Sequence, residues 1–337
     1  MSIVFATHAR YLDHLTGHGH PERPARLEAV LLGARYGGVD DALVALEPRP
    51  ATREEMERVH PAAYLDAITR FCAAGGGSID ADTTCSTASW EAATLAAGAG
   101  LAAVEALDGG VGTAAFCAVR PPGHHATRSR AMGFCILNNV AVAAASLAAR
   151  GERVLVVDYD AHHGNGTQDI FYGDGRVMYV SFHEWPLYPG TGALTDTGTG
   201  EGLGTTVNFP LPAGATGDIY LQAIDTVLAP LVAGFAPTWL VVSAGFDAHR
   251  RDPITGLGLS AGDYGAITQR LLEFAPPGHR LLMLEGGYDL QALADSTAAA
   301  LASLEGLQHH PEEPTKGGPG HQVVDAARHL WREAGLV

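Results

Sequence analysis

The chain has 337 residues, of which 47% are hydrophobic and 17% charged, a balance typical of a globular enzyme rather than a disordered chain. Its formal net charge of −16 argues against a broad phosphate-binding face, so we expect no nucleic-acid partner. The four cysteines form no C-x-x-C pair, and the sequence has neither a signal-peptide pattern nor a run of roughly 18 apolar residues, so we expect a cytoplasmic protein with no membrane partner.

Seven short apolar runs predict the strands of a sheet. Several are apolar throughout, which is typical of parallel strands covered on both faces. The runs are 2–6, 114–119, 153–158, 177–182, 205–209, 239–244 and 280–284. Helical patterns lie between them at 52–59, 87–107, 134–150, 216–233, 260–274 and 289–304. This alternation predicts right-handed βαβ units in a single α/β domain.

The end of the chain departs from this alternation. We place the domain at residues 1–310 and assign 311–337 to a linker, PEEPTKGGPG, and a final helix at 321–335. We expect this helix to pack on the same domain. His309 and His310 lie beside the linker and outside any motif, so we expect both to be exposed to solvent.

The strand at 153–158 runs into the sequence DYDAHHGNGT, where Asp158, Asp160 and His162 alternate. Residues spaced in this way point to one side of an extended chain. Burying two carboxylates beside an imidazole is costly unless a positive charge lies among them. Oxygen and nitrogen ligands of this kind suit zinc or iron(II). The alternative is a buried ion-pair cluster or a plain polar turn. If only one of these residues were present, we would prefer that alternative.

Other predicted strands also end in polar residues. They lead to Asp247, to the adjacent His124 and His125, and to Tyr288 after two glycines. Sites in open α/β sheets form beyond the carboxyl ends of the strands. Each residue alone has an ordinary alternative, such as core packing for the tyrosine, but together they predict an open metal site with catalytic groups around it. The three predicted ligands are Asp160, His162 and Asp247.

This constellation suits amide hydrolysis. A metal with three protein ligands keeps a position for water and polarises a carbonyl. A histidine beside that water can act as general base and then protonate the leaving amine, and Tyr288 can donate a hydrogen bond to the oxyanion. Asp158 and Asn165 could orient the two histidines through their second ring nitrogens. No G-x-S-x-G or P-loop motif is present, which disfavours serine-hydrolase and nucleotide chemistry.

The motifs resemble those of the histone deacetylase superfamily, which includes bacterial histone-deacetylase-like amidohydrolases, acetylpolyamine amidohydrolases and acetoin-utilisation proteins. The likeness extends from TGHGHPERPARL at 16–27 to EGGYDLQAL at 285–293. Between them, PPGHHA, DYDAHHGNGTQDIFY, SFHEWPLYPGTG and SAGFDAHRRDP follow in the order of the family. The resemblance implies the arginase–deacetylase fold, with a mainly parallel sheet of about eight strands flanked by helices.

The resemblance also implies metal ions at two places. It makes Asp160, His162 and Asp247 the ligands of a zinc ion, although the same ligand set accepts iron(II). It further implies a structural potassium ion. The residues of that second site are Asp158, Asp160, His162, Ser181 and the carbonyl of Phe182.

By the same resemblance, His125 is the general base and acid and His124 is its electrostatic partner. Asp158 pairs with His124, and Asn165 pairs with His125. Asn165 stands where many members of the family have aspartate, and asparagine is usual in the class II-like branch. Tyr288 matches the tyrosine that polarises the substrate carbonyl.

The resemblance assigns Phe134 and Tyr188 to the walls of an acyl-lysine tunnel, although ordinary core packing would explain aromatic residues equally simply. Gly133, Gly286 and Gly287 would permit close approach of the backbone to a substrate.

Substrate choice depends on the rim of that tunnel. Ile254 stands where polyamine-selective members tend to have an acidic residue, and it favours an uncharged chain such as acyl-lysine. Either Asp80 or Asp82 could hold a substrate backbone at the rim, and the sequence leaves that choice open. We expect His163 to be structural.

We therefore expect zinc-dependent hydrolysis of an acetyl or short acyl amide, on an acyl-lysine peptide or protein or on a small acylated amine. The alternatives are acetylpolyamine hydrolysis, two-manganese ureohydrolase chemistry on the same fold, and a non-catalytic acyl-lysine-binding module. The sequence does not determine the oligomeric state, and a homodimer or tetramer is left open.

Overall fold

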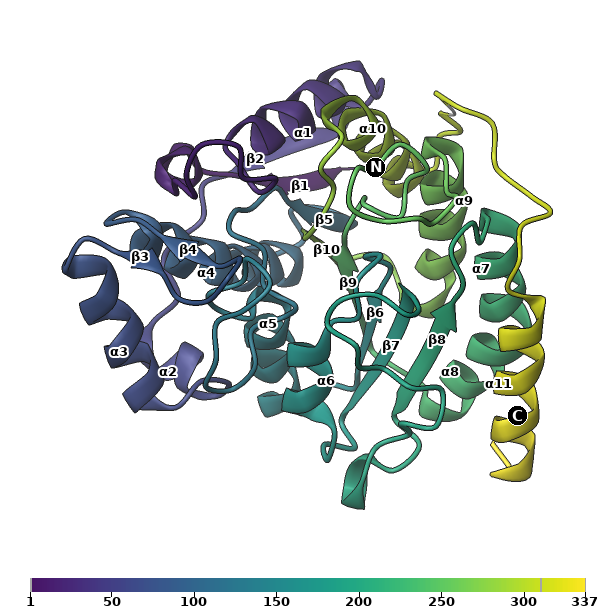
Figure 1. Ribbon diagram of the computed structural model, residues 1–337. Coiled ribbons are helices and arrows are strands. Elements are labelled where there is room, and N and C mark those ends of the chain that lie inside the picture. The colour runs from purple at the N-terminus through teal and green to yellow at the C-terminus, as the bar shows by residue number, and fades with distance from the viewer. Residues whose placement is uncertain (1, 310, 337) are drawn as a thin grey trace.

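The structure, a computed structural model, describes residues 2–309 and 311–336. His310 and the expected domain boundary at residue 310 lie outside the described residues. An eight-stranded sheet runs through the molecule in the order β2-β1-β5-β10-β9-β6-β7-β8, and every neighbouring pair is parallel (Figure 1). The strands are β1 Ile3–Ala6, β2 Leu43–Leu46, β5 Ala114–Cys117, β6 Val154–Asp158, β7 Val177–Glu184, β8 Thr206–Leu211, β9 Trp239–Ala244 and β10 Arg280–Leu284. The predicted α/β class and parallel sheet are confirmed.

Helices cover both faces of this sheet (Figure 1). One layer contains α4 and α5, and the other contains α1, α10 and α9. The helices are α1 Ala25–Tyr36, α2 Arg53–Glu57, α3 Ala62–Ala73, α4 Ser89–Asp108, α5 Asn139–Ala149, α6 Asn165–Phe171, α7 Gly217–Ala223, α8 Ala229–Phe235, α9 Ala261–Leu271, α10 Leu290–Glu305 and α11 His321–Glu333. Double cover explains why the inner strands are apolar throughout, since β5, β6 and β9 are buried along their whole length.

All seven predicted strands form, and the sequence pattern missed one strand of the sheet. That strand, β2, lies at the edge and is only partly buried, so it lacks the apolar run that marks the others. The pattern also missed α1, α3 and α6, and a short antiparallel hairpin of β3 Gly77–Ser78 and β4 Thr84–Cys85.

The expectation that the chain has no run of roughly 18 apolar residues is corrected by Gly217–Phe235. This run joins α7 and α8 through a π-helical turn at Ile224–Leu228. With a mean hydropathy of 1.2 over 19 residues, it is long and apolar enough to cross a membrane by length and composition. Half of it is buried inside the protein, where it packs on α9 and α11. A core helix passes the same test, so the run is weak evidence for a membrane span.

The C-terminal helix α11 packs on β8 and α7 and buries Trp331. The preceding segment has no regular structure, but it is fixed at Glu312, whose carboxylate accepts hydrogen bonds from His249 Nε2 (2.7 Å) and Ala261 N (3.1 Å). His309 is half-buried rather than exposed as expected.

The order of the strands determines where the site forms. The strands β5, β10, β9 and β6 are consecutive neighbours in the sheet. Because all of them are parallel, the four chain segments that follow them emerge at one edge. These segments carry His124 and His125, Tyr288, Asp247, and Asp158 to His162, in that order across the sheet.

Candidate active site

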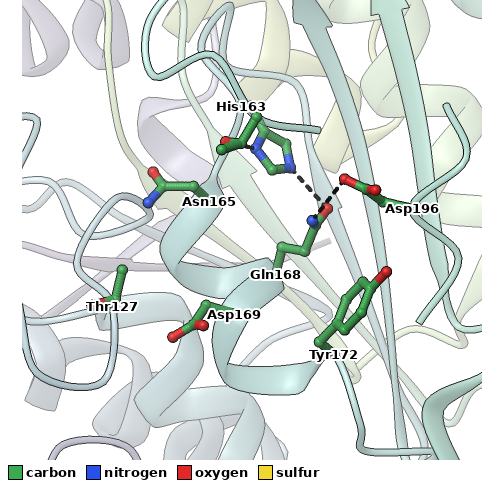
Figure 2. A pocket seen from close by; sticks show the side chains of 8 residues that line it. Thr127, His163, Asn165, Gln168, Asp169, Tyr172 and Asp196 are labelled. Atoms are coloured by element: carbon green, nitrogen blue, oxygen red, sulfur yellow. Dashed lines mark hydrogen bonds between the residues drawn. The ribbon is translucent and has the colours of Figure 1, made fainter. Parts of the chain in front are cut away.

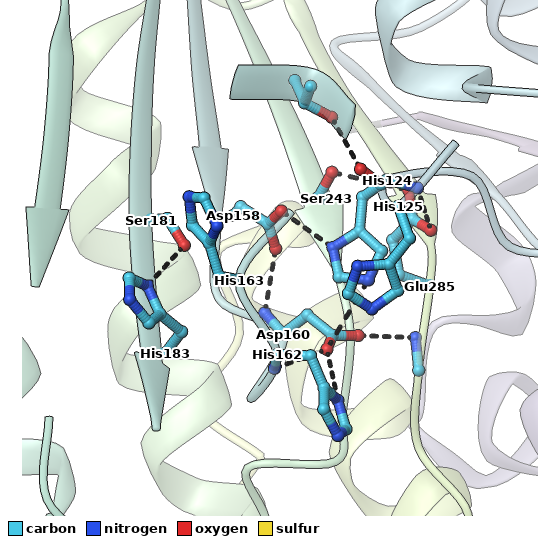
Figure 3. Close-up of polar contacts among 12 residues, drawn as sticks. His124, His125, Asp158, Asp160, His162, His163, Ser181, His183, Ser243 and Glu285 are labelled. Carbon is cyan, nitrogen blue, oxygen red and sulfur yellow. Dashed lines mark hydrogen bonds and ion pairs between the residues drawn. The ribbon is translucent and has the colours of Figure 1, made fainter. Parts of the chain in front are cut away.

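Asp160, His162 and Asp247 form a buried cluster beyond the ends of β6 and β9. Figure 3 shows Asp160 beside His162. One potential ligand atom from each lies within 4.8 Å of the others. His162 Nδ1 lies 3.0 Å from Asp247 Oδ2 and 3.2 Å from Asp160 Oδ1. The structure therefore brings together all three predicted metal ligands, which lie up to 87 positions apart in the sequence (247 − 160).

The electrostatics of this cluster call for a positive charge. Burial opposes charge on His162, but its hydrogen bonds with Asp160 and Asp247 outweigh burial and raise its pKa to about 10. Burial and the nearby charge of Asp160 raise the pKa of Asp247 to about 6. Two buried carboxylates and an imidazole are the donor set of a divalent transition-metal ion. The charge of such an ion would replace the proton that the raised pKa places on His162.

The backbone holds both carboxylates in place. Gly286 N donates to Asp160 Oδ2 at 2.8 Å, and Ala161 N donates to Asp247 Oδ1 at 2.7 Å. A Cβ atom at Gly286 would collide with both carboxylates. Glycine is thus required at this position because the backbone passes directly over the cluster.

His124 and His125 lie beside the cluster, and each has the predicted partner. His124 Nδ1 lies 3.0 Å from Asp158 Oδ2 (Figure 3). His125 Nδ1 lies 2.8 Å from Asn165 Oδ1. The amide oxygen of Asn165 can only accept, so His125 carries its proton on Nδ1 and keeps Nε2 free to take another.

The two imidazoles differ in charge. Burial alone would lower the pKa of His124, but the charges of Asp158 and Asp160 raise it well above its usual value. Burial lowers the pKa of His125 well below its usual value, and the charges of His124 and His162 add to the effect. At neutral pH His124 is therefore charged and His125 is neutral.

The residues of the expected potassium site lie at the ends of β6 and β7. Asp158 is in register with Ser181, and Phe182 follows in β7. Ser181 Oγ is 2.9 Å from Nδ1 of the buried His183, a partner that the sequence pattern did not indicate. The same carboxylate of Asp158 also accepts a hydrogen bond from the Tyr179 hydroxyl at 3.1 Å.

A cavity of about 220 Å³ opens above this cluster. Its lining residues are Asp82, His125, Gly133, Phe134, His162, Leu187, Tyr188, Ile254 and Tyr288. The ring of Tyr188 is 37% exposed and lies edge-on to His125, with centroids 5.1 Å apart, so it borders the opening and is not a core residue. Phe134 lies edge-on to Tyr288 at 5.8 Å. The structure thus gathers the predicted wall residues around one cavity.

The backbone at Gly133 and Phe134 adopts a left-handed conformation where it forms the wall of the cavity. Both residues have positive φ values, of 57° and 68°, and this is uncommon for phenylalanine. A Cβ atom at Gly133 would collide with the ring of His125. Thr83 Oγ1 accepts the Phe134 N–H at 3.1 Å and so holds the phenylalanine in this conformation.

The structure settles which of the two candidate carboxylates lies at the rim. Asp82 lines the cavity. Asp80 turns back to its own loop, where its Oδ1 accepts hydrogen bonds from the backbone N–H groups of Asp82 (3.2 Å) and Thr83 (2.8 Å). Asp80 therefore shapes the loop that presents Asp82.

Sequence reasoning missed two buried charged residues that hold the catalytic loops. Arg26 donates to the carbonyl oxygens of Gly287 (2.6 Å) and Glu285, and its guanidinium lies 4.8 Å from the centre of the Tyr288 ring. The carboxylate of Glu285 accepts the N–H groups of Gly123 (2.6 Å) and His124 (3.1 Å). Both residues occur in the quoted motifs, but nothing local to either position predicts these partners.

Tyr288 completes the site as a protonated hydroxyl, because burial raises its pKa well above its usual value. Gly286 and Gly287, which precede it, are not among the described residues that line the cavity. Gly286 lies against the carboxylate cluster, and Gly287 supplies a backbone φ of 117°.

A larger, polar cavity of about 410 Å³ lies next to Asn165 (Figure 2). His163 lies in its wall with both ring nitrogens engaged, by Thr191 Oγ1 at 2.8 Å and Gln168 Oε1 at 2.9 Å. These bonds agree with the structural role expected of His163. The described lining of this cavity includes neither Tyr288 nor a residue of the metal cluster.

Comparisons with known proteins agree over most of the chain. A family model described as the histone deacetylase domain matches residues 20–304. The chain is 40% identical over 312 residues to a probable deacetylase of Archaeoglobus fulgidus, a match that covers 90% of this chain and 86% of the relative. It is 36% identical over 307 residues to a histone deacetylase-like amidohydrolase of Pseudomonas aeruginosa, with 89% and 80% covered.

A solved structure agrees with these matches. The crystal structure of the HDA15 HD domain matches with a TM-score of 0.90 at 35% identity, and the match covers 98% of this chain and 95% of that one. The residues that the family model matches, 20–304, include all of the predicted site residues.

Proposed function

This chain belongs to the histone deacetylase family, and we propose that it removes an acetyl or short acyl group from Nε-acyl-lysine, in a peptide or protein, or from a related acylated amine. One observation supports this most. His125, His162 and Tyr288 line a single cavity with apolar walls. A neutral base, a metal ligand and a hydroxyl donor thus face the same small volume, as hydrolysis of an amide requires.

A zinc ion held by Asp160, His162 and Asp247 would polarise the acyl carbonyl and acidify a water molecule, and iron(II) would suit the same ligands. A potassium ion is proposed at the neighbouring oxygen donors of β6 and β7, which include Asp158 and Ser181. There it would offset part of the negative charge beneath the cluster.

Three residues of the chain, His125, His124 and Tyr288, have separate roles in the proposed hydrolysis. His125 takes a proton from the attacking water at Nε2 and returns it to the leaving amine, while Asn165 keeps its Nδ1 protonated. His124, held charged by Asp158, favours negative charge in the site. Tyr288 donates its hydroxyl to the acyl oxygen as charge develops there.

The test is hydrolysis of a fluorogenic acetyl-lysine peptide by the zinc-loaded protein and by a Tyr288→Phe variant. Loss of one donor to a developing oxyanion lowers kcat by about 100-fold or more. The matched control is Tyr36→Phe, whose hydroxyl bonds Asp295 between α1 and α10. Activity that survives in Tyr288→Phe would remove Tyr288 from the mechanism, and an inactive wild type with full zinc content would favour a non-catalytic acyl-lysine-binding module.

Acetylpolyamine hydrolysis is the second candidate, because the carboxylate of Asp82 at the cavity would attract a cationic amine. Ile254, in the same lining, favours an uncharged chain instead. Values of kcat/KM for acetylputrescine and for the peptide separate the two candidates. A clear preference for acetylputrescine that is lost in Asp82→Asn would replace the lysine assignment.

A further inference from the structure

We propose that Asp252 is a positioning residue that sets the hydroxyl of Tyr288 for catalysis, an inference that rests on the proposed function. Asp252 lies in the loop after β9, five residues beyond Asp247, and its side chain is buried. One oxygen, Oδ2, accepts the Tyr288 N–H at 2.7 Å. The other, Oδ1, accepts the Ile254 N–H at 3.1 Å. One carboxylate thus ties together the backbones of two residues that line the cavity.

The backbone before Tyr288 makes this bond important. Gly286 and Gly287 place few limits on backbone conformation, and Gly287 has a φ of 117° that other residues rarely adopt. The position of the Tyr288 ring therefore depends on what holds the segment. Arg26 holds the carbonyl oxygens of Glu285 and Gly287, but Asp252 holds the N–H of Tyr288 itself.

Burial and the charge of Asp247 raise the pKa of Asp252 to about 7, and the N–H groups of Tyr288 and Ile254 oppose this shift by favouring the ionised carboxylate. An ionised carboxylate accepts at both oxygens, and this matches two converging N–H donors. An asparagine of the same shape would present an NH2 group to one of them, so that one bond is lost and two donors face each other. A shift of about 1 Å in a reacting group can cost about 100-fold in rate. Asp252→Asn is therefore a nearly isosteric way to loosen Tyr288.

A double-mutant cycle tests the inference, with kcat and KM measured for Asp252→Asn, Tyr288→Phe and the pair on the acetyl-lysine peptide. In the Tyr288 background we expect Asp252→Asn to lower kcat by about tenfold to 100-fold, with a smaller change in KM. In the Tyr288→Phe background we expect no further loss of kcat, because no hydroxyl remains to be displaced. Equal losses in both backgrounds would show that Asp252 does not act through Tyr288.

Zinc content and melting temperature are measured for every variant, because Asp252 shares its loop with the metal ligand Asp247. Asp263→Asn is the matched control. Asp263 is another buried carboxylate that accepts two backbone N–H groups, from Ser260 at 2.8 Å and Thr315 at 2.9 Å. Its replacement should lower the melting temperature and leave kcat unchanged. A similar loss of kcat in Asp252→Asn and Asp263→Asn would show that Asp252 affects activity only by stabilising the fold.

Backbone hydrogen exchange provides a readout that does not depend on turnover. We expect Asp252→Asn to speed exchange at Ile254 and in the segment 285–290, and to leave α4 as protected as in the wild type. Unchanged exchange in both segments would overturn the positioning role, even in an active enzyme. An inactive wild type in which the variant still speeds exchange would overturn the proposed function and leave Asp252 as the anchor of Tyr288.

Discussion

At the scale of single residues, the site depends on two histidines that are adjacent in sequence and differ in charge, His124 being positive and His125 neutral. His124 faces Asp158, and His125 faces the uncharged amide of Asn165. The carboxylates of Asp158 and Asp160 raise the pKa of His124 against the effect of burial, whereas burial and the positive charges of His124 and His162 lower the pKa of His125, so only His124 carries a second ring proton at neutral pH. The residue pattern indicated that Asp158 and Asn165 orient the two histidines, and the family resemblance assigned each histidine its partner. The structure brings each pair within hydrogen-bonding distance.

Asn165→Asp tests this division. A carboxylate beside Nδ1 of His125 would favour the charged imidazole and raise its pKa. Activity requires neutral His125, so the acid limb of kcat/KM should move to higher pH by about one unit. The measurement is a pH profile at constant zinc occupancy. An acid limb that stays in place would mean that His125 is not the base that the profile reports.

At the scale of elements, local sequence signals specify several helix ends correctly. Thr52 and Glu55 form a capping box at the start of α2, and Ser260 and Asp263 form one at the start of α9. Glu55 also pairs with Arg49, at 2.7 Å between Oε1 and Nη2. This hydrogen bond, together with those from Thr52, lowers the pKa of Glu55 to about 2 against the opposing effect of burial.

Glu55→Gln should therefore cost stability in a pH-dependent way. The pKa of Glu55 is lower in the folded than in the unfolded chain, so its contribution is complete above pH 4.5 and is lost as the pH falls towards 2. We expect the variant to lower the free energy of unfolding by about 1 kcal/mol at pH 7, and by less at pH 3. Urea unfolding at the two pH values measures this. The neighbouring Glu54→Gln, whose side chain is 87% exposed, should have no effect at either pH.

At the scale of the whole molecule, one sheet gathers distant parts of the sequence at one edge. Four adjacent strands deliver the candidate metal ligands, the histidine pair and Tyr288 to the same place. The far edge of the sheet is covered by α11, which lies on β8 and α7 (Figure 1). Residues 321–333 are therefore part of the packed fold even though an irregular segment precedes them.

Trp331→Ala measures how much α11 contributes. The indole is 2% exposed, and removing a buried large aromatic side chain costs about 3 kcal/mol or more. We expect a lower melting temperature with kcat retained at temperatures well below it, since α11 packs on β8 and α7, and β7 separates β8 from the nearest strand that leads to the candidate site. Arg328→Ala, on the exposed part of the same helix, is the control. Equal stability of the two variants would show that α11 is not needed for the fold.

The sequence by itself determined the strands and the chemistry at their ends. Runs such as VLVVD are apolar because both faces of a parallel strand are buried, and charged residues directly after such a run must lie at its end. Those are local properties, so the residue pattern alone was enough to single out Asp160, His162, Asp247 and Tyr288. The edge strand β2 was not predicted, because a partly exposed strand lacks the continuous apolar run that marks the buried strands.

Only the tertiary structure decided which residues support that chemistry. Asp80 and Asp82 are equivalent in sequence, and the fold of their loop places Asp82 at the cavity. Arg26 and Asp252 act on the backbone around Tyr288, the first from 262 positions away (288 − 26) and the second from 36 (288 − 252). A backbone N–H or C=O group is the same at every position, so no residue type marks the partner of such a bond. Its identity is set by which loops the sheet brings together.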